Sequence, residues 1–162
     1  MKLDEYEEVS DQLSGVTCDV ATLAWNQEGA RTFPEPKFTA RFVFASFLTP
    51  NLHKVECQGM LLNSSSITDE QFFSIVMKFI RNGNPIGFKV KRKEADEVLR
   101  DNTITYFVEK ELNWTKKLLN DQAVASLDTP NFEAVLKSEK LPNGKTSVFV
   151  EFMEKGLTRP IQ

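Results

Sequence analysis

The sequence predicts an α+β fold: a single domain with a largely antiparallel sheet and helices packed on it. Three observations support this. Two segments, 38–62 and 132–153, have the pattern of β-hairpins, and an amphipathic helix is predicted between them, over 69–81. Hairpins interspersed with helices are typical of α+β folds and not of doubly wound ones. A chain of 162 residues fits one domain over 1–156 with a loose C-terminal tail over 157–162.

The segment 38–62 has the clearest strand pattern in the chain. Its apolar and polar side chains alternate with a period of two, which places them on opposite faces of a strand. A polar turn over 49–53 separates an outgoing strand from a returning one, so an antiparallel hairpin is predicted. Val43 and Phe47 are expected to point away from the core. The face expected in the core carries Phe38, Ala40, Phe42, Phe44, Ser46 and Leu48.

The helix over 69–81 has signals at both ends. Thr68 is a suitable N-cap, and Gln71 stands three residues later, as in a capping box. Gly83 and Pro85 follow the last turn, where helices commonly stop. We expect the apolar stripe of this helix to cover the core face of the first hairpin. The stripe consists of Phe72, Phe73, Val76, Phe79 and Ile80.

Shorter patterns surround these elements. A short amphipathic helix is predicted over 3–13 and a strand over 16–20. The segment 26–37 contains a glycine and two prolines and is predicted to be a loop. A strand with one apolar and one basic face is predicted over 86–91, followed by two helical turns over 95–101.

The region 103–127 supports two interpretations. The run over 103–108 is rich in β-branched and aromatic residues, which favours a strand, followed by a helix over 114–126 with Asn113 as its cap. Apolar residues at helical spacing favour instead one helix over 104–127. We prefer the strand and the separate helix, because the run over 103–108 is poor helix material.

The second hairpin is predicted over 132–153. Asn-Gly at 143–144 lies between two extended segments, and both residues tolerate the positive φ that a tight hairpin turn requires. Phe149 is expected on the face away from the core. The inward face is expected to carry Val148, Val150 and Phe152.

The charge balance is ordinary. Twenty basic and 23 acidic residues give a net charge of −3, so no global attraction to nucleic acid or to an anionic membrane is expected. No run approaches the roughly 20 apolar residues of a membrane helix, and the N-terminus lacks the apolar core of a signal peptide. We therefore expect a cytoplasmic protein without membrane contact. Cys18 and Cys57 are expected to stay reduced and to pack as small hydrophobic residues.

Residues that commonly carry catalysis are scarce. The single histidine, His53, lies in a predicted turn and Cys57 is expected on the core face, which disfavours a Cys/His dyad. One histidine and two distant cysteines cannot form the common zinc sets, and no phosphate-binding or dinucleotide-binding glycine motif occurs. We expect no metal and no cofactor, and we favour binding over catalysis. An enzyme with a carboxylate-based site stays an open alternative, because 23 acidic residues offer many pairs.

One candidate binding feature is a basic stretch. On the predicted strand, Lys89, Lys91 and Lys93 point the same way at intervals of about 7 Å, with Arg92 between them. Such a row of lysines can follow the phosphate backbone of a nucleic acid, as in proteins that bind single-stranded nucleic acid on a β-sheet. Lysines in a row also protect an edge strand from aggregation, which is the alternative explanation.

The other candidate feature is a surplus of aromatic residues. Phe47 and Phe149 are expected on non-core faces, where bases could stack, while Trp25 borders a loop and Trp114 opens a predicted helix. A sheet that is apolar on both faces must be covered on both, by its own helices or by a partner. We therefore hypothesise a non-catalytic protein–protein interaction or assembly module, including self-association. The alternative binding hypothesis is a single-stranded nucleic-acid-binding protein that uses the lysine-lined strand.

Overall fold

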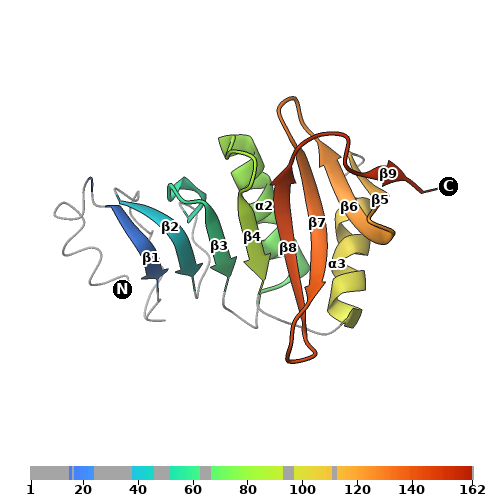
Figure 1. Ribbon diagram of the computed structural model, residues 1–162, viewed down its shortest axis with the longest axis horizontal. Helices are drawn as coiled ribbons and strands as arrows, with labels where there is room; N and C mark the ends of the chain where they lie inside the picture. The colour runs from blue at the N-terminus through green and yellow to red at the C-terminus, as the bar shows by residue number, and fades with distance from the viewer. Residues whose placement is uncertain are drawn as a thin grey trace.

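The chain folds as a single α+β domain, which confirms the predicted fold class. The computed structural model describes residues 15, 17–23, 38–45, 52–62, 67–92, 97–110 and 113–161. In these residues one nine-stranded mixed sheet, mostly antiparallel, carries two packed α-helices (Figure 1). The helix predicted over 3–13 and the loop predicted over 26–37 lie outside the described residues.

The elements follow one another in a mixed order. The helical elements are the 3-10 helix η1 (Leu52–Lys54), α2 (Asp69–Asn82) and α3 (Glu97–Lys110). The strands are β1 (Thr17–Leu23), β2 (Thr39–Ala45), β3 (Gly59–Leu62), β4 (Lys89–Arg92), β5 (Trp114–Leu119), β6 (Gln122–Asp128), β7 (Glu133–Lys140), β8 (Thr146–Met153) and β9 (Arg159–Pro160).

The sheet has a parallel half and an antiparallel half. Its spatial order is β1-β2-β3-β4-β8-β7-β6-β5-β9. Strands β1 to β4 pair in parallel, and every pairing from β4–β8 onward is antiparallel. After β4 the chain runs through α3 to the far end of the sheet, and the meander β5–β8 returns to pair with β4 (Figure 1).

The first predicted hairpin is wrong, because β2 and β3 are parallel. Before β3 begins, the chain has returned to the start of β2, where the amide of Ala40 donates to the carbonyl of Glu56 at 3.0 Å and the amide of Gln58 donates to Arg41 at 2.9 Å. The connection over 46–58 has the dozen or so residues that a parallel crossover requires. A period of two indicates which side chains share a face but carries no information about strand direction.

The predicted core face of β2 agrees with the structure at Phe38 and Ala40, which are buried in the core, but it is reversed from Phe42 onward. Val43 and Ala45 are fully buried, whereas Phe42 and Phe44 are only half-buried. Ala45 lies in the same cross-strand row as Arg92 of β4, whose guanidinium pairs with Asp69 of α2. This row therefore faces the helices, and the two phenylalanines occupy the other face of the sheet.

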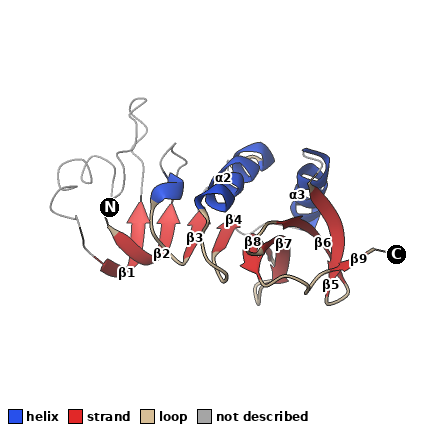
Figure 2. Ribbon diagram, turned by 90° about the horizontal axis from the view of Figure 1, so that it is seen from above, coloured by secondary structure: helices blue, strands red, loops and turns tan. Residues whose placement is uncertain are grey.

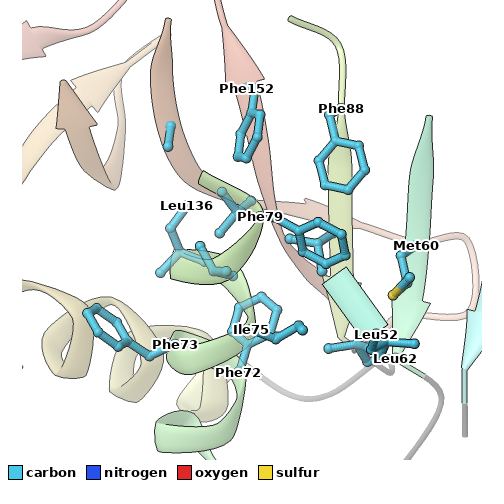
Figure 3. Close-up of a cluster of buried hydrophobic side chains, with 14 of the residues drawn as sticks. Leu52, Met60, Leu62, Phe72, Phe73, Ile75, Phe79, Phe88, Leu136 and Phe152 are labelled. Atoms are coloured by element: carbon cyan, nitrogen blue, oxygen red, sulfur yellow. The ribbon is translucent and has the colours of Figure 1, made fainter. Parts of the chain in front are cut away.

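The helix α2 confirms the predicted helix and its caps. The Thr68 hydroxyl accepts from the amide of Gln71 at 3.1 Å, and the Gln71 side chain accepts from the amide of Thr68 at 3.0 Å. Gly83 ends the helix with φ +74° and donates its amide to the carbonyl of Ile80. The stripe packs partly toward the sheet, where the Phe79 ring centroid lies 4.8 Å from that of Phe88 just before β4 (Figure 3). Phe73 packs instead on α3, with its ring centroid 4.9 Å from that of Phe107.

Between 97 and 128 both sequence interpretations fail in part. The predicted strand 103–108 lies within α3, and the predicted helix 114–126 is the hairpin of β5 and β6. The alternative prediction, a single helix over 104–127, agrees with the structure only over 104–110, where α3 ends. Ile104 and Phe107 lie three residues apart, are buried, and join the core around α2. Burial of this apolar pair outweighs the β propensity of the run.

The C-terminal half follows the predicted hairpin and adds a final strand. Strands β7 and β8 pair as expected, and Val148, Val150 and Phe152 are buried. The segment 157–162, expected to be a loose tail, instead contains β9, which pairs antiparallel with β5. The Thr158 hydroxyl donates to the Glu133 carboxylate, so this segment lies over the β6–β7 part of the sheet on the face away from the helices.

Candidate functional site

Both α-helices pack on the same face of the sheet (Figure 2). On the opposite face the C-terminal segment covers the β5–β7 part, and no other described element covers β2, β3, β4 and β8. We call this part the helix-free face. It carries Phe42, Phe44, Leu61, Lys89, Lys91, Lys137, Phe149 and Glu151.

Three lysines surround one phenylalanine on the helix-free face. The ammonium nitrogens of Lys89, Lys91 and Lys137 lie 5.8, 5.5 and 5.7 Å from the ring centroid of Phe149. Phe149 is 4% exposed, and the apolar stems of lysines commonly cover apolar surface in this way. Glu151 lies 3.3 Å from the Lys137 nitrogen and 3.8 Å from that of Lys89. Three cations thus face one carboxylate, and the local excess is positive.

The position of β4 bears on the alternative explanation of these lysines. Strand β4 lies between β3 and β8, in the interior of the sheet. Lysines protect sheet edges from pairing with other chains, and an interior strand has no free edge to protect. Lys89 and Lys91 therefore need another explanation.

Apolar side chains continue the helix-free face beyond the lysines. The rings of Phe42 and Phe44 meet edge to face, with centroids 5.2 Å apart. Leu61 pairs with Phe44 on one side and with Lys91 on the other. Val20 of β1, which is 55% exposed, pairs with Phe42. A partly exposed apolar strip on β1–β3 therefore ends at the lysines of β4.

A glycine shapes this strip. A Cβ atom on Gly59 would lie 2.9 Å from the Phe42 ring and 3.3 Å from the carbonyl oxygen of Lys89. Real Cβ contacts are essentially never shorter than 3.0 Å, so the ring rests directly on the glycine backbone. Glycine inside a strand often marks such a close approach.

Two predicted binding residues lie in the interior instead. Arg92 points to the helix side, where its guanidinium lies 2.5 Å from the Asp69 carboxylate and donates to the carbonyl of Ile67 at 2.6 Å. Trp114 is 1% exposed, and its ring centroid lies 5.0 Å from that of Phe107. Both side chains therefore join elements of the fold: Arg92 links β4 to α2 and α3, and Trp114 of β5 packs on α3.

The remaining predicted site residues have different outcomes. Lys89 and Lys91 share the helix-free face, and Phe149 lies beneath them. Because the Phe149 ring is covered, it offers no open surface on which a base could stack. Lys93, Phe47 and Trp25 lie outside the described residues.

Cys57 has little capacity for nucleophilic chemistry. Burial raises the pKa of the Cys57 thiol to about 12, so the reactive thiolate is scarce at neutral pH. Cys18 is half-buried, and its thiol donates weakly to the carbonyl of Thr39 at 3.7 Å. Both thiols are free.

The described part of the chain holds neither a cluster of metal-ligating side chains nor a helix that could span a membrane. No group of three or more His, Cys, Asp or Glu side chains there is arranged to hold a metal ion. None of its helices combines the length and the apolar character needed to cross a membrane.

Sequence reasoning missed Phe42, Phe44, Leu61 and Lys137 as surface residues. The alternation assigned the two phenylalanines to the core, because an aromatic-rich face is normally the buried one. Gly59 was the available signal, since a glycine in a strand indicates that another group approaches its backbone. Lys137 joins the cluster only through the pairing of β7 with β8.

Comparison of the chain with protein-family models, with curated proteins and with solved structures gave no match. The candidate function therefore depends on the geometry of the helix-free face.

Proposed function

We propose that this chain is a non-catalytic protein–protein interaction module that binds an acidic partner protein through the helix-free face. The observation that supports the proposal is the partly exposed apolar strip next to a lysine cluster with excess positive charge. Protein interfaces combine apolar and aromatic residues at the centre with a polar rim. The strip would supply the centre, and the lysines would select a partner with carboxylates at matching positions.

The charges of the lysine cluster support an acidic partner in particular. Lys91 contacts the Phe149 ring but forms no ion pair with any carboxylate in the described residues. Lys89 keeps 42% of its side chain exposed although it approaches Glu151. Positive groups without close counter-charges raise the association rate of acidic partners and make it dependent on salt.

Two exposed valines permit a matched test. Val20 is 55% exposed in the apolar strip, whereas Val98 is 64% exposed on α3, away from the helix-free face. A carboxylate at Val20 would disturb a docked acidic surface, and the same change at Val98 should not. Both substitutions replace an exposed side chain, so neither should alter folding strongly.

The experiment couples capture with reconstitution. Proteins retained by the immobilised chain are identified and purified, and their affinity for wild type, Val20→Asp and Val98→Asp is measured at two salt concentrations. We expect Val20→Asp to weaken binding about tenfold or more, Val98→Asp to have no effect, and salt to weaken the wild-type complex. Equal affinity of both variants, or no purified partner that binds, would refute the proposal. Light scattering of the isolated chain tests whether a second copy is the partner.

A second candidate function is single-stranded nucleic-acid binding. Lys89 and Lys91 share one face of β4 at a spacing of about 7 Å, which suits a phosphate backbone. Labelled oligonucleotides at two salt concentrations test this. Binding that weakens with salt and disappears in Lys89→Glu/Lys91→Glu would support it, and no binding at low salt would exclude it.

A further inference from the structure

A cavity of about 460 Å³ opens where β1, β2, β3 and β4 meet on the helix-free face. Its volume lies within the range of small-ligand sites. The residues that line it and carry charged or polar groups are Asp19, Arg41, Gln58, Lys89 and Lys91, and its apolar lining includes Val20 and Phe42.

The charges of the cavity are unbalanced. Three cationic side chains, Arg41, Lys89 and Lys91, face one lining carboxylate, Asp19. The Arg41 side chain is exposed and, like that of Lys91, has no ion pair within the described ranges. Glu151, which does not line the cavity, lies 3.8 Å from the Lys89 nitrogen. It reduces the excess positive charge of the cavity but does not remove it. An oxyanion would complement the remaining positive charge, and arginine suits phosphate because its planar fork donates two hydrogen bonds.

One wall of the cavity is aromatic and held in position. The Phe42 ring rests on the backbone of Gly59 and is braced from the side by Phe44. Gln58, which also lines the cavity, carries an amide that can both donate and accept hydrogen bonds. A planar ring with polar edges matches this combination, because it can stack on Phe42 while its edge meets Gln58.

We propose that this cavity binds a nucleotide, with the phosphate held by Arg41, Lys89 and Lys91 and the base against Phe42. The ligand chemistry, a heteroaromatic base carrying a phosphate, is shared by free nucleotides and by single units of a nucleic-acid strand. The inference goes beyond the docking of a protein partner and does not depend on it.

The test is calorimetric titration of the whole chain with four probes: a nucleoside monophosphate, the uncharged nucleoside, inorganic phosphate and a short single-stranded oligonucleotide. We expect the monophosphate to bind more tightly than the nucleoside or phosphate. Arg41→Gln should weaken it about tenfold or more, because a hydrogen bond to a charged group is lost. Phe42→Leu should weaken it at least about fivefold through loss of stacking.

The matched control is Arg81→Gln, which removes an exposed arginine of α2 that does not line the cavity. Equal effects of Arg41→Gln and Arg81→Gln would overturn the proposal, as would equal affinity for inorganic phosphate and nucleotide, or no binding of any nucleotide probe. Much tighter binding of the oligonucleotide than of the monophosphate identifies the source as a strand, and similar affinities identify it as a free nucleotide.

Failure of this site is distinguishable from failure of the protein-docking proposal. If no nucleotide probe gives binding heat, while a purified partner protein binds wild type and binds Val20→Asp more weakly, the nucleotide site is refuted and the docking proposal is supported. If a nucleotide binds, Arg41→Gln weakens that binding, and no protein partner is found, the nucleotide site is supported and the docking proposal is refuted.

Discussion

The strongest prediction concerns Arg92, which joins three elements inside the protein. Its guanidinium lies 2.5 Å from the Asp69 carboxylate at the start of α2 and donates to Thr103 of α3 at 3.1 Å. It also donates to the carbonyl of Ile67 and lies over the Phe72 ring, 5.3 Å from its centroid. We expect Arg92→Met to destabilise the fold, because methionine keeps part of the apolar volume but donates no hydrogen bond.

The magnitude follows from the burial of the pair. The Arg92 side chain is 7% exposed and that of Asp69 is 24% exposed. Removing one partner of a buried pair costs about 3–5 kcal/mol, and water can reach part of the remaining Asp69 carboxylate. We therefore expect Arg92→Met to lower the free energy of unfolding by about 3 kcal/mol, near the lower end of that range.

Chemical denaturation of a double-mutant cycle measures this. The cycle compares wild type, Arg92→Met, Asp69→Asn and the double variant. The slope of the unfolding free energy against denaturant concentration should be the same for all four proteins, so that the midpoints report stability. We expect the double variant to be destabilised by at least about 1 kcal/mol less than the sum of the single variants, because the second substitution removes the unpaired charge. A loss below about 0.5 kcal/mol for Arg92→Met, or an additive cycle, would refute the reasoning.

The exposed pair Arg100–Asp101 supplies the control. Its atoms lie 2.9 Å apart, but the side chains are 33% and 65% exposed. Surface pairs contribute about 0–1 kcal/mol. Arg100→Met should therefore change stability far less than Arg92→Met.

Three further outcomes are expected. Thr68→Ala should cost about 1 kcal/mol of unfolding free energy, measured by denaturation, because the N-cap bond is lost, and Thr68→Ser should retain most of it. Gly59→Ala should cost about 1–3 kcal/mol and shift the NMR signals of the Phe42 ring, since the added Cβ would lie 2.9 Å from it, and an unchanged ring signal would contradict this close approach. Burial raises the pKa of Cys57 above its ordinary value of 9.0 to about 12, so the unfolded state releases that proton first as the pH rises. Wild type should therefore lose stability relative to Cys57→Ala from pH 9 towards 12, and parallel denaturation profiles over that window would exclude the effect.

Local signals predicted the elements whose geometry is decided by neighbouring residues. The caps of α2 depend on Thr68, Gln71 and Gly83, all within a turn of the helix ends, and the sequence identified each of them. The β7–β8 hairpin was predicted from Asn-Gly at 143–144 in the same way. A comparable signal at the β5–β6 turn was missed: Asn120 and Asp121 have φ of 49° and 64°, which asparagine and aspartate tolerate better than most residues.

The candidate site could be predicted only in part. Lys89 and Lys91 were expected on one face because they lie two residues apart on one strand. Their relation to Lys137, Phe42 and Arg41 depends on strands that are distant in the sequence, and no local pattern encodes those pairings. For the same reason the sequence predicts Arg92 as a binding residue. In the structure its side chain points inward and pairs with Asp69 of α2 and Thr103 of α3.

By itself the sequence determined the α+β class, the capped helix α2 and the C-terminal hairpin, because turns, caps and alternation act over a few residues. Only the tertiary structure decided the parallel direction of β2 and β3, the helical state of the 103–108 run, and which face of the sheet meets the helices. Each of these features depends on which apolar surfaces are buried against one another. The free energy of that burial comes from contacts between segments that are distant in the sequence.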